Sequence, residues 1–416
     1  MADVMRLGFA GLGEAATLVV PEVAQLPYVE LTAAADMRQA ARERFAQEYE
    51  AAVFPTVEEL CAYPHVDAIY IATPHELHAQ HVITALEHDK HVIVEKPMAL
   101  TIDDCERMNE TAEKRGLKLM CGHTKSFDPP IRKMREIITS GQLGKLWMVN
   151  TWNYNDFLVR PYPDRELIVS RGVVLNQGPH QVDIIRLLGG GMVRSVRAIT
   201  TNRGDPTRPE GAFGCFMEFE DGAFATLIFT GYGYFDTGEL TWWLGEATYP
   251  GRNQDSRKAF NKIRGSERER ILQELKNDTR YGEPGSKAYG HEGSDKLRQY
   301  GWGEHRDPSW AAGHQRFYGL TVASCEKGEM RQSQDGILIY GDGEVTEVPI
   351  TDKVFGRQAE ITELYEAVMH GQPMFHDGRW GEATLEVCLG MLQSSAERRE
   401  IMMAHQVPVK EPSRRV

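Results

Sequence analysis

Cysteine is scarce in this sequence, and the few cysteines form no motif. All six lie far apart along the 416 residues, and no C-x-x-C pair could begin a zinc site or a redox centre. We therefore expect reduced thiols in a core. They are Cys61, Cys105, Cys121, Cys215, Cys325 and Cys388.

Long apolar runs and an excess of positive charge are also missing. No stretch approaches the ~20 apolar residues of a membrane span. The apolar N-terminal stretch is interrupted by Asp3, Arg6 and Glu14, unlike a secretory signal. The formal charge of -13 would repel nucleic acid or an anionic bilayer. We expect a cytoplasmic protein without nucleic-acid or membrane partners, in which an anionic substrate would need a local group of Arg or Lys.

What is present is the composition of a globular chain, 41% hydrophobic and 26% charged, long enough for two domains. Over residues 1–124, short β-branched runs alternate with helical stretches, which predicts a doubly wound parallel α/β domain. Thr101 and Gly116 bound one expected helix, and Asp128 to Gly141 another. The expected strands are Met5–Ala10, Glu30–Ala35, Ala68–Ala72, His91–Val94 and Lys118–Cys121.

The pattern changes beyond Leu146, where longer strands follow one another with few helices between them. This predicts an α+β domain over 125–416, built on a large, mostly antiparallel open sheet. Residues 245–312 are polar and Gly-rich, and we interpret them as a long insertion with a helix over Glu267–Lys276. The other expected elements are strands Leu146–Asn155, Val193–Thr201, Ala212–Glu218 and Ala223–Thr230, and helices Pro179–Leu188, Gln358–His370 and Gly378–Glu397.

A glycine-rich turn directly follows the first expected strand. Gly11-Leu12-Gly13-Glu14-Ala15-Ala16 fits the G-x-G-x-x-A fingerprint: a tight turn at Gly11, close approach of a pyrophosphate at Gly13, and close helix packing at Ala16. The helix N-terminus would supply N–H groups to the phosphates. The alternative is that these glycines only serve a turn.

Asp36 ends the second expected strand, 23 residues after Gly13, where a carboxylate would bind the adenosine ribose. The alternative is a helix cap. Arg38 could hold the 2′-phosphate of NADP, but Asp36 would repel that phosphate. We therefore predict NAD as the cofactor.

Two further segments follow later strands, at the edge where open α/β sheets bind ligands: Thr73-Pro74-His75-Glu76-Leu77-His78 and Glu95-Lys96-Pro97. Oxidation of an alcohol needs a base for the O–H proton while hydride leaves for NAD. A lysine can serve once burial and the cationic nicotinamide lower its pKa. Lys96 is our candidate, and the alternative is a surface lysine paired with Glu95.

Together these segments resemble the glucose-fructose oxidoreductase, inositol dehydrogenase and MocA-like family, with its AGxGxxA-type start, TPxxxH segment and EKP motif. The resemblance covers the chain apart from the insertion. It implies that Lys96 lies beside the nicotinamide and exchanges a proton with the substrate, and that Pro97 follows a cis bond. The expected cofactor-binding residues are Gly11, Gly13, Glu14, Ala15, Ala16, Asp36, Arg38, Thr73, Pro74, His75, His78, Glu95, Lys96 and Pro97.

The same family carries a D-x-x-x-H pair in its second domain, where this chain has Asn176 and His180. His180 matches the histidine that contacts the reacting oxygen. Asn176 departs from the pattern, because an amide can orient a hydroxyl but cannot take its proton. We therefore expect Lys96, His180 and Asn176 in the catalytic site, with proton transfer on the first two. The alternative for His180 is a satisfied core histidine.

His75, His78 and His81 are the nearest approach to a metal motif. On a helix, His81 would lie ~240° around from His75, so the three could not face one ion. No cysteine or carboxylate pair completes a site. We predict no metal, with capping and packing roles for these rings.

The segment 152–176 mixes aromatic rings with guanidinium groups: Trp152, Tyr154, Phe157, Arg160, Tyr162, Arg165 and Arg171. This suits a planar ring that carries carboxylates, because Arg binds carboxylate in a bidentate way. The alternative is a set of solvent-facing arginines on a loop. Residues 122–130 and 150–157 resemble the phthalate 4,5-cis-dihydrodiol dehydrogenases of the family. The expected substrate-binding residues are His123, Lys125, Trp152, Tyr154, Arg160, Arg171 and His180.

This resemblance implies NAD-dependent oxidation of cis-4,5-dihydroxy-4,5-dihydrophthalate to 4,5-dihydroxyphthalate in aromatic degradation. The rival hypotheses are a sugar or inositol dehydrogenase that uses the same residues, and an inactive NAD-responsive regulator. The resemblance also implies a homodimer or homotetramer, built through a sheet face that helices leave uncovered.

Overall fold

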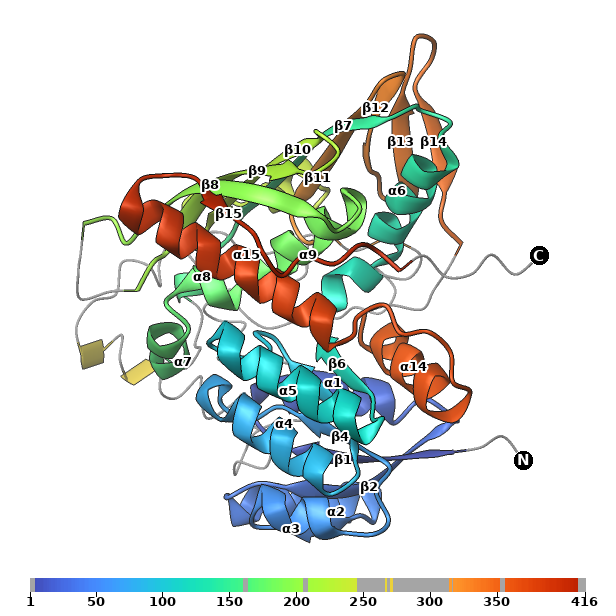
Figure 1. Ribbon diagram of the computed structural model, residues 1–416, viewed down its shortest axis with the longest axis vertical. Coiled ribbons are helices and arrows are strands. Elements are labelled where there is room, and N and C mark those ends of the chain that lie inside the picture. Colours follow the sequence, from blue (N-terminus) through green and yellow to red (C-terminus); the bar gives the residue numbers. More distant parts are fainter. Residues whose placement is uncertain are drawn as a thin grey trace.

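Two sheets form the frame of the protein in the computed structural model (Figure 1). The structure describes residues 4–159, 164–204, 209–244, 266–267, 270–271, 314–315, 317–351 and 356–410. Most of the expected insertion, and most of its expected helix over Glu267–Lys276, lie outside the described residues.

The first sheet is parallel, with strand order β3-β2-β1-β4-β5-β6, which is the Rossmann order predicted by the alternating pattern. The three-residue strand β3 was missed, because none of its side chains is fully buried. The elements are β1 Met5–Ala10, α1 Glu14–Val23, β2 Val29–Ala35, α2 Gln39–Tyr49, β3 Ala52–Phe54, α3 Val57–Ala62, β4 Ala68–Ile71, η1 His75–Leu77, α4 His78–Glu87, β5 His91–Glu95, α5 Ile102–Arg115 and β6 Leu119–Gly122.

Helix boundaries follow their local signals. Thr101 caps α5, because its hydroxyl accepts a hydrogen bond from the backbone N–H of Asp104, and Gly116 ends α5 with a φ of 67°. Helix α6 (Pro129–Ser140) begins at the predicted prolines and ends at Gly141, whose φ is 72°.

The second sheet has nine strands in the order β14-β13-β12-β11-β7-β10-β9-β8-β15, and only the β7–β10 pair is parallel. The predicted mostly antiparallel sheet is therefore confirmed, although its strands beyond β10 were not predicted. They are β7 Leu146–Tyr154, β8 Val193–Thr201, β9 Ala212–Phe219, β10 Phe224–Thr230, β11 Leu320–Cys325, β12 Gly328–Gln332, β13 Gly336–Tyr340, β14 Thr346–Pro349 and β15 Ile401–Met402.

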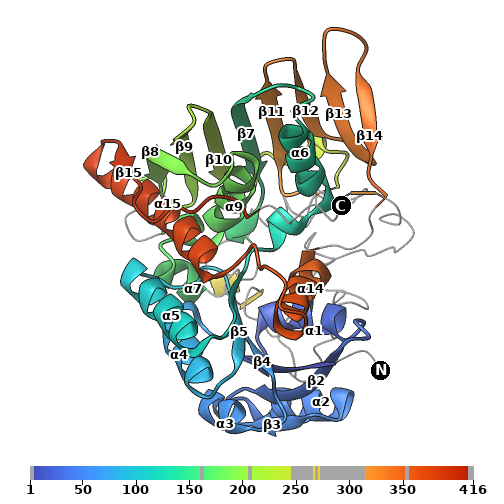
Figure 2. The same ribbon diagram turned by 45° about the vertical axis from the view of Figure 1, so that its right-hand side comes forward.

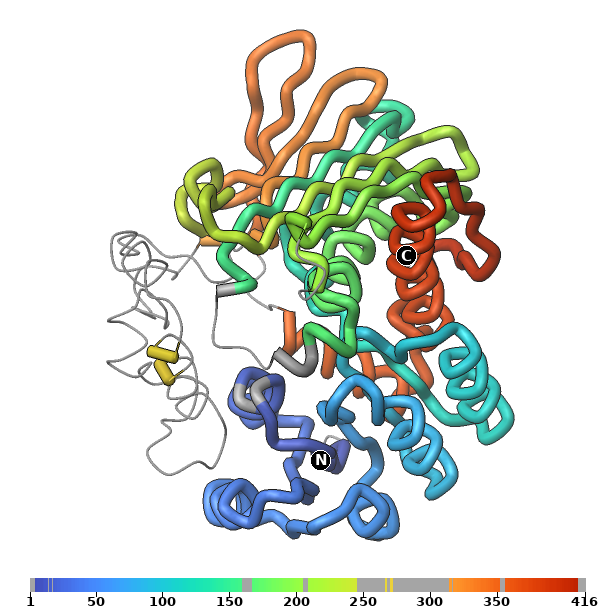
Figure 3. Tube along the Cα trace, turned by 90° about the vertical axis from the view of Figure 1, so that its left-hand side faces the viewer, coloured from blue at the N-terminus to red at the C-terminus, as the bar shows by residue number. Residues whose placement is uncertain are grey.

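Helices α9 (Gly178–Leu188) and α15 (Gly378–Glu397) lie between this sheet and the Rossmann domain (Figure 1). Helix α15, red in Figure 3, contacts β8 of the upper sheet and α5 and β6 of the lower domain. The shorter elements between the domains and along the second sheet are η2 Thr124–Phe127, η3 Phe157–Val159, α7 Asp164–Val169, α8 Val173–Asn176 and η4 Thr237–Leu240.

Helix α14 (Gly356–Met369) comes late in the sequence but packs on the Rossmann domain beside α1 (Figure 2). Its Ile361 and Leu364 belong to the same buried cluster as Leu7 and Phe9 of β1. A segment from late in the sequence therefore returns to the first domain and packs in its core. None of the described helices combines the length and apolarity that crossing a membrane requires.

Candidate active site at the domain junction

The turn after β1 is shaped for a dinucleotide. Gly11 has a φ of 92°, and a Cβ there would lie 2.6 Å from the carbonyl oxygen of Ala72, so only glycine fits. A Cβ on Gly13 would meet no atom within 4 Å, and Gly13 has no side chain to cap α1. The N–H groups at the start of α1 therefore face open space. The fully buried Ala16 allows close packing of this helix. These residues fit the pyrophosphate of NAD.

Asp36 lies at the end of β2 and is tied to the same turn. Its Oδ2 accepts a hydrogen bond from the backbone N–H of Leu12 at 2.8 Å, and its Oδ1 accepts from Nε of Arg38 at 3.1 Å. Arg38 in turn donates to the carbonyl of Leu12 at 2.6 Å. A 2′-phosphate approaching Arg38 would therefore meet the Asp36 carboxylate, which fits NAD better than NADP.

The loops after β4 and β5 are joined by a histidine. Both ring nitrogens of His78 lie 2.9 Å from carbonyl oxygens, those of Pro97 and Thr73. The Lys96–Pro97 peptide bond is cis, as predicted. His78 thus connects the TPxxxH loop to the EKP loop from a fully buried position.

The two neighbouring histidines have other partners. Nδ1 of His75 lies 2.6 Å from the hydroxyl of Ser170, and Nδ1 of His81 lies 2.9 Å from that of Thr73. These contacts hold the two rings against neighbouring segments of the chain. Burial holds the pKa of His75 well below its usual range, and it lowers that of His81.

Lys96, Asn176 and His180 come together where the two domains meet. Nζ of Lys96 donates to the backbone carbonyl of Asn176 at 2.9 Å. His180 lies in the first turn of α9 and is 7% exposed, and its Nδ1 has no hydrogen-bond partner in the described part of the chain. Burial, together with Lys96 and Lys125, holds the pKa of His180 well below its usual range. At neutral pH a neutral imidazole therefore faces the junction beside an amine.

The side chain of Asn176 is held by residues that the sequence did not point to. Its Oδ1 accepts from Nε2 of Gln177 at 2.8 Å, and Oε1 of Gln177 accepts from the hydroxyl of Tyr318 at 2.8 Å. The rings of Tyr318 and His180 have centroids 4.9 Å apart, and Nζ of Lys125 lies 5.8 Å from the centroid of the Tyr318 ring. Tyr318 follows the long polar segment and belongs to no motif, so no local signal pointed to it.

The alternative hypothesis paired Glu95 with Lys96 on the surface, but the structure buries Glu95 and pairs it with an arginine. It is 6% exposed, and its Oε1 forms an ion pair with Arg357 of α14 at 2.7 Å. The hydroxyl of Tyr70 donates to the same oxygen at 2.8 Å. Arg357 was not predicted, because it lies 262 positions further along the chain than Glu95.

Of the residues expected to bind substrate, His123 and Lys125 lie directly after β6, at the sheet edge that carries Lys96. His123 is 2% exposed, its Nδ1 has no partner among the described residues, and burial lowers its pKa to about 4. Lys125 is half-buried between His180 and Tyr318.

Trp152 and Tyr154 lie elsewhere, because strand side chains alternate between faces. Thr151 is buried on the helix side of the sheet, where Nε2 of Gln181 donates to its hydroxyl at 2.7 Å. Trp152 therefore points to the opposite face and is 43% exposed, and Tyr154 shares that face and packs against Phe235. The structure does not bring these two rings to Lys96.

Of the arginines expected to bind carboxylate, the structure describes the side chain of Arg171 alone. Arg171 is exposed in the turn before α8. Phe157 is buried in η3. Arg160 and Tyr162 lie outside the described residues, as does the side chain of Arg165.

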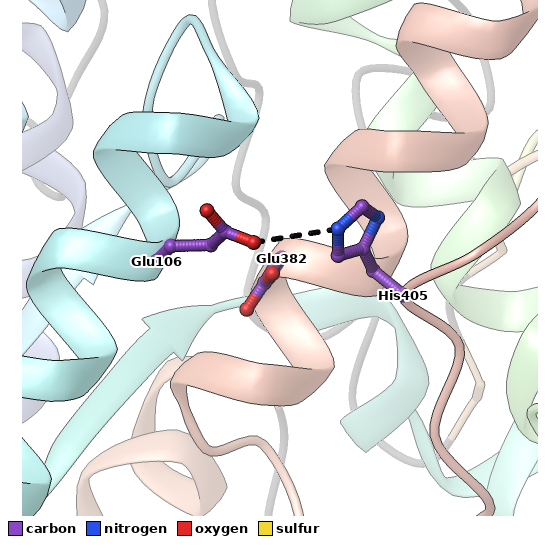
Figure 4. A group of neighbouring side chains, drawn as sticks. All are labelled: Glu106, Glu382 and His405. Atoms are coloured by element: carbon purple, nitrogen blue, oxygen red, sulfur yellow. Dashed lines mark ion pairs between the residues drawn. The ribbon is translucent and has the colours of Figure 1, made fainter.

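A group with metal-ligating atoms does occur away from this site: Glu106 of α5, Glu382 of α15 and His405 (Figure 4). Its contacts are those of a protonated histidine, because Nδ1 of His405 lies 2.9 Å from Glu386 and Nε2 lies 3.4 Å from Glu106. The hydrogen bond to Glu386 raises the pKa of His405, and Arg379 neutralises Glu382 at 3.1 Å. We interpret the group as an ion-pair network between the domains.

Two consecutive stretches in the first 243 residues match known sequence families. Residues 5–123 match the GFO_IDH_MocA oxidoreductase family with its NAD-binding Rossmann fold, and residues 131–243 match the GFO/IDH/MocA C-terminal domain. The chain is 35% identical over 392 residues to 1-carboxy-3-chloro-3,4-dihydroxycyclohexa-1,5-diene dehydrogenase of Comamonas testosteroni, covering 94% of each chain.

Two solved structures are similar to this chain along nearly its whole length. A protein from Bordetella bronchiseptica RB50 superposes with a TM-score of 0.82 at 36% identity, covering 96% of this chain and all of that one. The WlbA dehydrogenase from Bordetella pertussis, solved with NADH and UDP-GlcNAcA, superposes with a TM-score of 0.68 at 18% identity, covering 97% of this chain and 98% of that one, and shares the fold.

Proposed function

Because this chain belongs to the GFO/IDH/MocA family and is an NAD-dependent oxidoreductase, we propose that it oxidises a cis-diol on a carboxylated cyclohexadiene ring. The supporting observation is the meeting of Lys96, Asn176 and His180 at the domain junction, where Lys96 follows a strand of the same parallel sheet that carries the dinucleotide turn. The specific substrate proposed is cis-4,5-dihydroxy-4,5-dihydrophthalate, with 4,5-dihydroxyphthalate as product.

Each residue of the site has a role in that reaction. NAD, when bound, supplies the acceptor for the hydride that leaves the alcohol carbon. Lys96 takes the hydroxyl proton as that carbon becomes a carbonyl, and the Asn176 carbonyl holds its amine in place. Nδ1 of His180, which has no partner among the described residues, contacts the reacting oxygen. The ketone then loses a ring proton and gains one on oxygen, which completes an aromatic ring and draws the oxidation forward.

The charges around the junction support an anionic substrate. Lys125 brings a cation close to His180, whereas the nearby carboxylate of Glu95 is already paired with Arg357. His123, His180 and the Asn176 amide add hydrogen-bonding groups without negative charge. The Tyr318 ring beside His180 offers a face to a flat ring. The dehydrogenase from Comamonas testosteroni, whose named substrate carries a carboxyl group and two hydroxyls on a cyclohexadiene, supports the same choice.

A comparison of substrates tests the proposal. The purified protein with NAD is supplied in parallel with cis-4,5-dihydroxy-4,5-dihydrophthalate, a monocarboxylated cyclohexadiene cis-diol, myo-inositol and glucose, and NADH is measured. We expect turnover with the carboxylated diols. Turnover with the polyols alone would overturn the aromatic proposal in favour of a sugar or inositol dehydrogenase, and no turnover with any of them would favour a regulator.

We also propose a homodimer or homotetramer formed through the face of the nine-stranded sheet that carries Trp152. Cross-strand neighbours on that face include Trp152 with Ile228, and Phe216 with Thr226. Trp152 and Phe216 are 43% and 41% exposed, and Ile199 is 65% exposed. A contiguous apolar surface of this kind favours association.

A further inference from the structure

Two buried carboxyl groups, one of them on the residue that precedes Lys96, share their partners. Glu95 precedes Lys96 in the chain, and Glu360 of α14 is fully buried. Nη1 of Arg357 lies 2.7 Å from Oε1 of Glu95 and 3.3 Å from Oε2 of Glu360. The same nitrogen donates to the hydroxyl of Tyr70 at 2.8 Å, and that hydroxyl donates to Glu95 at 2.8 Å.

The two carboxyl groups carry different charges. Burial raises the pKa of Glu360 to about 8, so this carboxyl is mostly protonated at neutral pH. Burial also opposes ionisation of Glu95, but Arg357, Lys96 and the Tyr70 hydroxyl outweigh it and lower its pKa. One buried negative charge, on Glu95, is therefore matched by one positive charge, on Arg357.

Within the described part of the chain, the other titratable groups that interact with Lys96 include three imidazoles. His75 and His78 face it from the loop after β4, and His180 faces it from α9. Burial lowers the pKa of all three, and it holds those of His75 and His180 so far below 6.5 that these two rings are neutral at pH 7. Lys125 adds a cation on the far side of His180. Glu95 and Arg357 thus form the oppositely charged pair beside Lys96.

We propose that Arg357 is a positioning residue that acts through Glu95: by matching the charge of Glu95, it leaves Lys96 able to accept the substrate proton at neutral pH. An unmatched buried carboxylate beside Lys96 would favour the ammonium form, which cannot act as a base. The inference rests on the proposed role of Lys96. It deepens that role by assigning control of the base to a C-terminal helix.

Two substitutions with opposite expected effects test the proposal. Arg357→Met keeps an unbranched side chain without charge, and Glu95→Gln removes the carboxylate while leaving Arg357. Activity should rise with pH as Lys96 loses its proton. We expect Arg357→Met to move that limb of the kcat/KM profile by about one unit to higher pH, which costs about tenfold in rate below the limb. Glu95→Gln should move it to lower pH.

Three further variants separate charge from structure. Arg357→Lys should keep the limb close to its original position, and the double variant Glu95→Gln/Arg357→Met should return it there. Arg379→Met is the matched control, because it removes an arginine that pairs with Glu382 away from Lys96. Thermal unfolding and NAD binding are measured for every variant, and if Arg357→Met does not fold, Glu95→Gln and the double variant decide.

A second measurement keeps this inference separate from the proposed substrate. Lysines carrying isotope-labelled methyl groups are titrated by NMR, and the Lys96 signal is assigned with Lys96→Arg. The same directions of shift are expected without any substrate. Unchanged limbs and unchanged Lys96 titration in both single variants would overturn the role of Arg357. Absence of diol oxidation with shifted titrations would overturn only the proposed function.

Discussion

Lys96 is the residue whose surroundings decide most of the chemistry. Its amine is held by a backbone carbonyl, the carboxylate before it is paired with an arginine, and neutral imidazoles surround it. A lysine in this setting differs from an exposed one because its amine is fixed at the domain junction, close to the neutral imidazole of His180. The site therefore combines a base with hydrogen-bonding groups that carry no negative charge.

Replacing Lys96 should separate chemistry from cofactor binding. Lys96→Ala removes the proton acceptor and is expected to lower kcat by about 10²–10⁴-fold, because that is the usual contribution of a positioned acid or base. NAD affinity, measured by calorimetry, should change little. The control is Lys114→Ala, an exposed lysine on α5 that should keep full activity. Full turnover in the Lys96 variant would remove the base from this account.

At the scale of the element, the two glycines in the turn between β1 and α1 have different roles. Gly11 is needed by the fold, since its φ of 92° and its approach to Ala72 exclude a side chain. Gly13 has ordinary dihedral angles and open space around its missing Cβ, so its value lies in what the space admits.

Two matched substitutions distinguish these roles. Gly11→Ala is expected to lower the free energy of unfolding by about 1–3 kcal/mol through backbone strain and the close contact. Gly13→Ala should leave stability within about 0.5 kcal/mol but weaken NAD binding about tenfold or more, because the methyl group would occupy the pyrophosphate space. Denaturant unfolding and calorimetry with NAD give both quantities. Equal effects of the two substitutions on stability would contradict this division.

Helices α14 and α15 are the elements that join the domains. Helix α14 adds apolar side chains to the Rossmann core and carries Arg357 to Glu95, while α15 packs against both sheets. Gly122, at the end of β6, leaves room for this arrangement, because a Cβ there would lie 2.6 Å from Oε1 of Glu360. The position of the site thus depends on helices from the far end of the chain.

At the scale of the whole molecule, His405 contributes a contact between domains that depends on pH. Its Nδ1 pairs with Glu386 of its own domain, and its Nε2 pairs with Glu106 of the Rossmann domain. The pair with Glu106 is drawn in Figure 4. Its pKa is raised in the folded protein, chiefly by the hydrogen bond to Glu386. The stabilisation is therefore fully present below the unfolded value of about 6.5 and is lost as pH rises through the higher folded value.

His405→Gln should accordingly lower Tm most at acidic pH, and the difference from the parent protein should shrink as pH rises above neutral. Scanning calorimetry between mildly acidic and alkaline pH measures this. His370→Gln is the control, because His370, directly after α14, pairs with Glu366 of that helix and so makes a local contact. A difference in Tm that stays constant across the pH range would refute the charged contact.

The exposed sheet face predicts association of copies of the chain. Ile199→Asp/Phe216→Asp places two charges on that face and should shift the protein toward monomers, because burying unpaired charges is unfavourable. Sedimentation velocity measures the change. Val345→Asp, at an exposed site between β13 and β14, should leave the assembly intact. A monomeric parent protein would overturn the proposal.

Much of this protein was determined by the sequence alone. The period of its apolar residues specified most of the strands through residue 230, although it missed the short β3. The φ requirement of Gly11 and the strand ends at Asp36 and Lys96 placed the nucleotide turn and the candidate base. These are short-range signals, because the physics of a turn, a cap or an alternating strand acts within a few residues.

The surroundings of the base were decided only by the tertiary structure. Tyr318 and Arg357 come from segments far along the chain, and nothing in their local sequence records that folding brings them to Gln177 and Glu95. Trp152 is the opposite case. Its aromatic ring suited a substrate site, but the alternation of side chains along β7 places it on the exposed face of the sheet, away from Lys96. Contacts between distant segments depend on how helices pack on sheets, and that is a property of the folded chain as a whole.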